Sequence, residues 1–312
     1  MLTKGFRPRP KLFRKPKLRP ERRSMTVCIA AVCEDDSDKY RVVLCRDWRG
    51  EVQGVGSSDN IEKIHWIGKG WVALSAGSDP RADELCTRFE NHLKTTPFTE
   101  ENIVDQSRFV FHEYKKALTD SHFNTKYGFP YSFAVNHGRE KFGEAFVGEC
   151  LNEAAQILVG AELIIVGFVD VMDYATMKPW RAPMIVLISE NCEEVVSLEN
   201  EFAAIGSAGN TARTILFLRD QDSIDSLMST IYAVYEAKAL SESVPGIGES
   251  FSIDVMDEDG KVLTLSDAGA KRCKELFGRF GPRPRTEKTE SWFKMDESYL
   301  EDVDEEEKKP QS

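Results

Sequence analysis

The residue with the clearest chemical potential is Thr26, which follows an internal methionine, Met25, and opens the apolar run Thr26 to Ala31. If the chain is cut after Met25, Thr26 carries both a hydroxyl and a free α-amino group. A threonine hydroxyl is a weak nucleophile at neutral pH and needs a base to accept its proton. A free α-amine has an ordinary pKa of about 7.7–8.0, close to the pH at which a base works best. Thr26 therefore has the two groups that begin amide hydrolysis.

The 24 residues before Met25 differ in composition from the rest of the chain. They hold ten Lys or Arg, a single acid, and four of the 13 prolines. Such a segment cannot bury a hydrophobic core, so we expect residues 1–24 to be disordered. Three interpretations stay open: a removable propeptide, a basic arm for anionic partners, or a stretch upstream of a true start at Met25. In the third case, removal of the initiator methionine would expose Thr26 without a protease.

Charge and composition exclude several classes of function for the remainder. Subtracting the +9 of the arm from the whole-chain charge of −11 leaves −20 on residues 25–312, which disfavours nucleic acid and anionic lipid as partners. The seven cysteines form no CxxC pair, and the histidines show no metal-ligand spacing, so we expect reduced thiols, no metal and no cofactor. No apolar run approaches the roughly 20 residues that span a bilayer. We expect a cytoplasmic protein.

The elements that must position Thr26 can be predicted from hydrophobic spacing. We expect one domain over residues 26–280, with an acidic, disordered tail at 281–312. Residues 120–160 indicate a loop and then a helix from 142 to 158, and resemble an insertion. The expected strands are 26–33, 42–46, 61–67, 70–76, 162–169, 183–188, 193–206, 250–256 and 260–265. The expected helices are 79–92, one from Thr99, 210–219, 223–240 and one ending near Phe277.

Blocks of strands alternating with blocks of helices favour antiparallel sheets stacked on each other. Each sheet must bury one face, and each helix must bury one stripe of its surface. The sequence therefore predicts an α+β protein with four layers, two antiparallel sheets between two layers of helices.

Several separated motifs, in order, resemble one known family. They are Thr26 to Ala31, Val42 to Arg49, Glu62 to Ile67, Ala76 to Ser78, and a Gly-Ser stretch, Ala204 to Ala212. Together they resemble the proteasome β-subunit and HslV type of N-terminal nucleophile hydrolase, over roughly residues 26–265. The resemblance implies the αββα sandwich of that family, in a divergent, bacterial-type member.

The resemblance also implies roles for individual residues. Thr26 matches the nucleophile, with its own amine as the base. Lys63 matches the lysine whose charge lowers the pKa of that amine, and Asp47 matches its partner carboxylate. Gly77 matches the residue whose backbone N–H forms the oxyanion hole, and Ser207 matches the serine that contacts the amine. Each residue also has an ordinary structural explanation, as a surface lysine, a turn aspartate, a turn glycine or a helix N-cap.

The sequence departs from the family where an aspartate and a Ser-Gly pair are expected after the second long helix. Glu242 is the nearest match for the aspartate, and Pro245 stands where the serine would be. Proline supplies neither a hydroxyl nor an N–H, so the support of the site is altered there.

Three functions from different classes follow. The first is a threonine-type peptidase that acts on peptides or proteins and assembles as a homo-oligomeric ring or stacked rings. The second is a catalytically inactive structural subunit of such an assembly, because a fold does not determine chemistry. The third is a non-enzymatic binding module that recruits partners through its charged ends.

Overall fold

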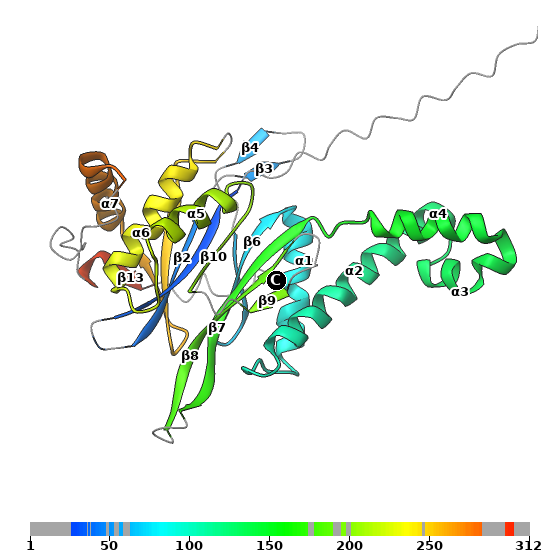
Figure 1. The fold of residues 1–312 in the computed structure, drawn as a ribbon, viewed down its shortest axis with the longest axis horizontal. Helices are drawn as coiled ribbons and strands as arrows, with labels where there is room; N and C mark the ends of the chain where they lie inside the picture. Colours follow the sequence, from blue (N-terminus) through cyan, green and yellow to red (C-terminus); the bar gives the residue numbers. More distant parts are fainter. Residues whose placement is uncertain are drawn as a thin grey trace, which may run out of the picture.

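Two antiparallel sheets and a set of helices make up the part of the chain described by the computed structural model (Figure 1). That part comprises residues 26–35, 37, 39–47, 50–52, 56–58, 63–173, 178–189, 195–197, 201–244, 247–282 and 297–302. The arm at 1–24, Met25, Pro245 and most of the tail lie outside the described residues.

The first sheet carries the start of the described chain. Its six strands follow the order β10-β1-β2-β11-β12-β13, and each neighbouring pair is antiparallel. In register, Cys28 of β1 lies opposite Arg46 of β2 and Ile205 of β10. The strands are β1 (Cys28–Glu34), β2 (Tyr40–Asp47), β10 (Phe202–Ile205), β11 (Phe251–Asp257), β12 (Val262–Leu265) and β13 (Leu300–Asp302).

The second sheet has five strands in the order β5-β6-β7-β8-β9, again antiparallel throughout. They are β5 (Ile64–Gly68), β6 (Trp71–Gly77), β7 (Ala161–Asp173), β8 (Lys178–Ile188) and β9 (Val195–Ser197). A separate two-stranded hairpin, not expected from the sequence, pairs β3 (Gly50–Val52) with β4 (Gly56–Ser58).

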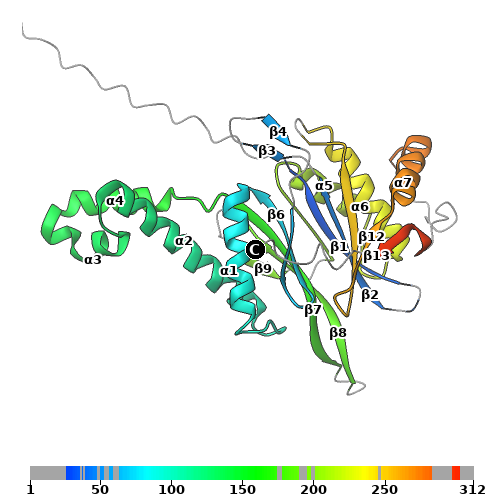
Figure 2. The ribbon, with the colours of Figure 1, turned by 180° about the vertical axis from the view of Figure 1, so that it is seen from behind.

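Helices lie outside the two sheets. They are α1 (Asp79–Leu93), α2 (Ile103–Tyr127), α3 (Tyr131–Phe142), α4 (Glu144–Ala155), α5 (Gly209–Leu218), α6 (Leu227–Ser241) and α7 (Asp267–Phe280). None of these helices is both long and apolar enough to cross a membrane. Figures 1 and 2 place α5, α6 and α7 beside the first sheet and α1 beside the second.

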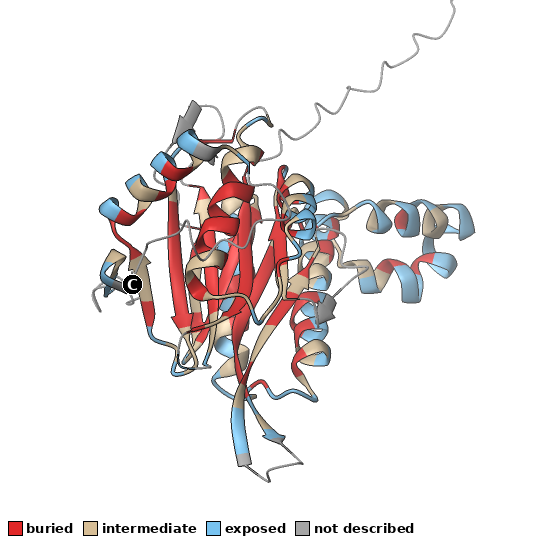
Figure 3. Cartoon of the chain, turned by 60° about the vertical axis from the view of Figure 1, so that its left-hand side comes forward, coloured by how far each residue is buried: buried red, intermediate tan, exposed pale blue. Residues whose placement is uncertain are grey.

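Three clusters of buried side chains hold these layers together. One joins the two sheets face to face, with Leu44 of β2 and Leu74 of β6 among its members. A second packs the outer face of the first sheet on α5 and α6, and a third packs the second sheet on α1 and α2. Figure 3 shows the same division, with buried strands at the centre and exposed helix surfaces outside. The α+β class and the two antiparallel sheets are confirmed, and the arrangement is compatible with the expected sandwich.

The outer part of α2, with α3 and α4, projects sideways from the sheets (Figures 1 and 2). It has its own small core, built around Phe123 and Cys150 and surrounded by aromatic rings. Glu153 of α4 ties α4 to the end of α2, accepting hydrogen bonds from His122 and Tyr127, each at 2.7 Å, and from Lys126. We call α3, α4 and the segment of α2 from His122 onward the helical projection.

Three expectations about individual segments are wrong. The predicted strand 193–206 is two strands in different sheets, β9 and β10. The loop expected after residue 120 is largely helical, since it holds the end of α2 and all of α3. Gly138 does not interrupt α3, and its lack of a side chain leaves room for Val147 of α4. Residues 297–302 of the predicted disordered tail form a 3-10 helix (Glu297–Tyr299) and β13. They are ordered because Tyr299 and Leu300 pack against the core of the first sheet.

Candidate functional site

Thr26 lies just before β1, against the turn that connects β10 to α5. Its backbone N–H donates a hydrogen bond to Ser207 Oγ at 3.2 Å, and its carbonyl oxygen accepts one from the N–H of Ala208 at 3.4 Å. The structure therefore brings together Thr26 and Ser207, which are 181 positions apart in the sequence. In the chain with residues 1–25 attached, Thr26 is completely buried.

Gly206 makes this close approach possible. Its φ angle is +88°, and a Cβ atom there would lie 2.2 Å from the carbonyl oxygen of Thr26. Because no side chain fits in that space, glycine is required at this position. The N–H of Gly206 donates to Glu162 Oε2 of β7 at 2.8 Å, so a carboxylate of the second sheet holds the turn in place.

Asp47 and Lys63 form a buried ion pair next to Thr26. Lys63 Nζ lies 2.5 Å from Asp47 Oδ1, and the same oxygen accepts the N–H of Val27 at 3.3 Å. Lys63 is 2% exposed and Asp47 is 0% exposed. Burial raises the pKa of Asp47, and the Lys63 charge and the N–H groups of Val27 and Gly248 only partly offset it, so the pKa stays above its ordinary value.

The strand pairings explain how this pair is assembled. Since Cys28 lies opposite Arg46, Asp47 at the end of β2 comes beside Val27, and the Asp47 N–H donates to the Val27 carbonyl at 3.2 Å. Lys63 precedes β5 in the other sheet, where its carbonyl accepts the N–H of Ser75 at 2.9 Å. The Cys28 thiol donates to the Ser75 carbonyl at 3.4 Å and so connects the two sheets. Lys63 therefore reaches from the second sheet to a carboxylate of the first.

The charge of Lys63 acts on other groups besides Asp47. Burial raises the pKa of Cys28 to about 12 despite the lysine's opposing effect, so Cys28 is a buried neutral thiol rather than a reactive one. Burial also raises the pKa of Asp79, at the start of α1, and Lys63 again opposes that shift. A second carboxyl group thus lies within the electrostatic reach of the lysine.

Gly77 ends β6, with a φ angle of +108°. A Cβ atom there would lie 2.4 Å from the carbonyl oxygen of Gly160, and Gly77 is paired with Ala161 of β7. Close packing between strands is therefore sufficient reason for glycine at this position, whatever its N–H does in catalysis.

Glu242, at the end of α6, faces a lysine rather than the threonine. It forms an ion pair with the buried Lys238, whose Nζ also donates to the carbonyls of Gly248 at 2.8 Å and Glu249 at 2.9 Å. The N–H of Gly248 acts in turn on Asp47. Glu242 is therefore linked to the site through Lys238 and the segment at 247–249.

Three contributors to the site were missed in the sequence: Glu162, Lys238 and Gly248. Glu162 carried a weak signal, because it stands directly before the apolar run Leu163 to Val166 of β7, whereas Lys238 shares α6 with a second charged residue, Glu236, and carried none. Gly248 carried none, since only the folded chain brings its N–H near Asp47.

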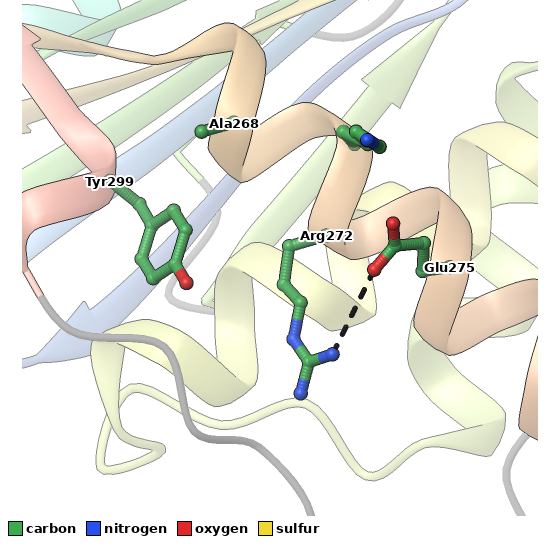
Figure 4. A pocket seen from close by; sticks show the side chains of 5 residues that line it. Ala268, Arg272, Glu275 and Tyr299 are labelled. Carbon is green, nitrogen blue, oxygen red and sulfur yellow. Dashed lines mark ion pairs between the residues drawn. The ribbon is translucent and has the colours of Figure 1, made fainter.

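The pocket shown in Figure 4 lies elsewhere, on α7 and the 3-10 helix that precedes β13. Its lining includes Tyr299, Arg272 and Glu275, with Arg272 Nη1 at 3.9 Å from Glu275 Oε2. It includes none of the six candidate residues.

The comparisons with known proteins add no family assignment. No protein-family model matches the chain, and a search of curated proteins also finds no match. Within the described residues, no group of three or more His, Cys, Asp or Glu side chains is arranged to hold a metal ion.

The arrangement therefore has three parts. Thr26 lies just before β1, and its backbone N–H donates to the hydroxyl of Ser207. The buried Lys63–Asp47 ion pair binds the N–H of Val27, the next residue in the chain. The Lys63 charge is thus connected through Asp47 to the backbone N–H of Val27, the residue that follows Thr26.

Proposed function

We propose that this chain is a threonine-type amide hydrolase that acts on peptides or proteins, with the sandwich fold of the proteasome β-subunit and HslV type. The observation that carries the proposal is the buried Lys63–Asp47 pair, which also binds the backbone N–H next to Thr26. A fully buried ion pair costs desolvation energy that an apolar pair would not, so its position beside a candidate nucleophile favours a functional role.

The proposed reaction begins when the chain is cut after Met25. The nitrogen that now donates to Ser207 becomes a free amine, and this amine accepts the proton of the Thr26 hydroxyl as Oγ attacks a peptide carbonyl. The proton passes to the departing amine of the substrate, which leaves an ester on Thr26. Water then hydrolyses the ester and restores the hydroxyl. The Lys63 charge keeps the amine unprotonated, and Asp47 holds Lys63 in position.

A second candidate function is an inactive structural subunit with the same fold. The observation in its favour is that the Lys63–Asp47 pair joins the two sheets, a structural role that requires no free amine at Thr26. For either function we propose assembly into a homo-oligomeric ring through the outer helices. A binding module that uses the charged ends remains a third hypothesis, which no described contact favours.

The test combines intact mass with activity. We expect the protein from its native source to begin at Thr26 and to hydrolyse unstructured peptides. Thr26→Ala should lower the rate by about 10³-fold or more, whereas Thr26→Ser, which keeps a hydroxyl, should retain part of it. Thr214→Ala, an exposed change on α5, is the matched control and should leave the rate unchanged.

Two results would count against the hydrolase. A native chain that begins at Met1 and hydrolyses nothing would favour the structural subunit. Hydrolysis by folded Thr26→Ala protein at the wild-type rate would exclude Thr26 as the nucleophile.

A further inference from the structure

Two large apolar side chains are unusually exposed around the connection between α5 and α6. Phe217 at the end of α5 is 72% exposed, and Ile224 in the connection is 70% exposed. Leu218 follows Phe217 in the sequence and is also exposed. We call Phe217, Leu218 and Ile224 the 217–224 patch. Three large exposed apolar side chains within one short segment favour a binding surface.

The connection that carries the patch is firmly held. Arg219 binds the buried carboxylate of Glu236 with two hydrogen bonds of 2.7 Å. The side-chain amide of Gln221 donates to the carbonyl of Val32 at 3.3 Å and to Thr230 Oγ1 at 3.1 Å. A segment anchored in this way presents its apolar side chains in a fixed arrangement, which lowers the entropy cost of binding a partner.

Acidic side chains accompany the patch. Asp222 accepts the N–H of Ile224 at 3.3 Å, and Ser223 Oγ donates to Glu201 at 3.3 Å. Burial and the nearby Asp222 carboxylate both raise the pKa of Glu201, so these two acids are close enough to repel each other. Within the described residues, neither forms an ion pair with a lysine or arginine. A partner for this surface should therefore be both apolar and basic.

Residues 1–24 have that composition. Their ten Lys and Arg are interspersed with Phe6, Leu12, Phe13 and Leu18. The rest of the chain is strongly acidic, so this segment is the one that complements the acids beside the patch.

The arm also ends at a suitable place. The turn before α5 contacts Thr26 through Ala208, and the segment after α5 contacts Val32 through Gln221. Residues 26–32 extend over about 20 Å at roughly 3.3 Å per strand residue. The 24 residues of the arm reach up to about 80 Å when extended, so they can cross that distance easily. Covalent attachment gives the arm an effective concentration in the mM range at the patch, an advantage that no separate partner has.

We propose that residues 1–24 dock on the 217–224 patch of their own chain, with apolar side chains on Phe217 and Ile224 and basic side chains near Glu201 and Asp222. The docking concerns the chain with its arm attached and does not depend on whether Thr26 is a nucleophile. Docking would hold the arm along the outside of α5. The arm is also the segment that must be removed if Thr26 is to be exposed.

Zero-length carbodiimide cross-linking of the full chain tests the proposal, because it joins a lysine amine to a carboxylate in contact with it. The arm supplies four lysines, Lys4, Lys11, Lys15 and Lys17. We expect their cross-links to concentrate on Glu201 and Asp222. The double variant Phe217→Ser/Ile224→Ser should lower the yield at least about fivefold, as loss of an anchoring side chain does in other interfaces. Both side chains are too exposed for their loss to unfold the protein.

Phe109→Ser, at a similarly exposed phenylalanine on α2, is the matched control and should leave the yield unchanged. A mixture of ¹⁵N-labelled and unlabelled protein distinguishes cross-links within one chain from those between two. The proposal is overturned if arm cross-links spread evenly over surface acids, if the double variant and the control behave alike, or if the cross-links join different chains.

Discussion

Replacement of Lys63 by methionine tests whether the buried ion pair is formed as described. The side chain of methionine is similar in length and apolar, so the change removes the charge and leaves little cavity. Asp47 then loses its ion-pair partner in a site where it is 0% exposed and keeps the N–H groups of Val27 and Gly248. We expect the folded state to be destabilised because a buried carboxylate remains without a neighbouring cation.

The magnitude follows from burial. Removal of one member of a fully buried pair costs about 3–5 kcal/mol, against about 0–1 kcal/mol for an exposed pair. In a domain of this size about 1 kcal/mol corresponds to roughly 2–4 °C in Tm, so Lys63→Met should lower the Tm by about 10 °C. The exposed pair Lys94–Glu90, at 2.8 Å, supplies the control, and Lys94→Met should change Tm by no more than about 3 °C.

The effect should also depend on pH. The pKa of Asp47 is raised in the folded state, so ionisation of Asp47 lowers the stability of the folded protein. This loss develops as pH rises from the ordinary pKa of a carboxyl group to the pKa of Asp47 in the folded state. Without Lys63 that folded value rises further. The difference between variant and wild type should therefore be smaller near pH 4 than at pH 7, since protonated Asp47 needs no cation.

Thermal unfolding followed by circular dichroism measures these shifts, with Asp47→Asn/Lys63→Met as the decisive comparison. The double variant should be more stable than Lys63→Met alone at pH 7, because it leaves no buried charge. A Tm of Lys63→Met within about 3 °C of wild type, or a double variant less stable than the single one, would refute this reasoning.

Two further predictions concern other parts of the fold. Gly206→Ala should cost more than about 2 kcal/mol in unfolding free energy, since the new Cβ meets the Thr26 carbonyl. Gly128→Ala, also at positive φ but facing open space, should cost about 1 kcal/mol; equal losses in chemical denaturation would contradict the predicted clash. For Glu153, burial raises the pKa, but hydrogen bonds from α2 outweigh it and bring the pKa to about 2 from an ordinary 4.5. The ionised carboxylate therefore stabilises the helical projection above about pH 4.5 and loses this effect as pH falls towards about 2. The protection of the α4 amides against hydrogen exchange, taken relative to the intrinsic exchange rate at each pH, should therefore decrease over that interval and stay unchanged in Glu153→Gln.

The strands around Thr26 were predictable because local hydrophobic patterns determine them. The run at 26–33 became β1, and the runs at 42–46 and 70–76 became β2 and β6. Hydrophobic spacing does not reveal which sheet a strand joins. The segment 193–206 therefore looked like one strand, although β9 and β10 belong to different sheets.

The tail shows that average composition does not always predict whether a segment is ordered. Tyr299 and Leu300 lie in an acidic stretch, and the average of that stretch predicts disorder. Their contacts are with the first sheet and its helices, far away in the sequence, and the N–H of Ser266 donates to the Tyr299 carbonyl at 2.7 Å. These contacts and the pairing of β13 with β12 hold residues 297–302 in place.

For the candidate site, the sequence indicated which residues to consider, but it did not indicate all the contacts between their side chains. The fold brings Ser207 to the Thr26 N–H and Lys63 to Asp47, and the catalytic roles of these residues stay a prediction. The pairing of Glu242 with Lys238 could not be predicted, because hydrophobic spacing indicates a helix over 223–240 but not which of its charged side chains is buried. In the structure it is completely buried, and its amine holds the segment that reaches Asp47.

The separate core of the helical projection has a consequence for the evolution of this chain. Phe123 and Cys150 pack against each other and against nearby aromatic rings. Helices α3 and α4 lie away from both sheets. Local unfolding of α3 and α4 would expose little of the sheet cores, so their stability is a property of the projection itself. Substitutions there can accumulate without disturbing the strands that position Thr26. The projection is thus the region where related chains are expected to diverge fastest in sequence and length.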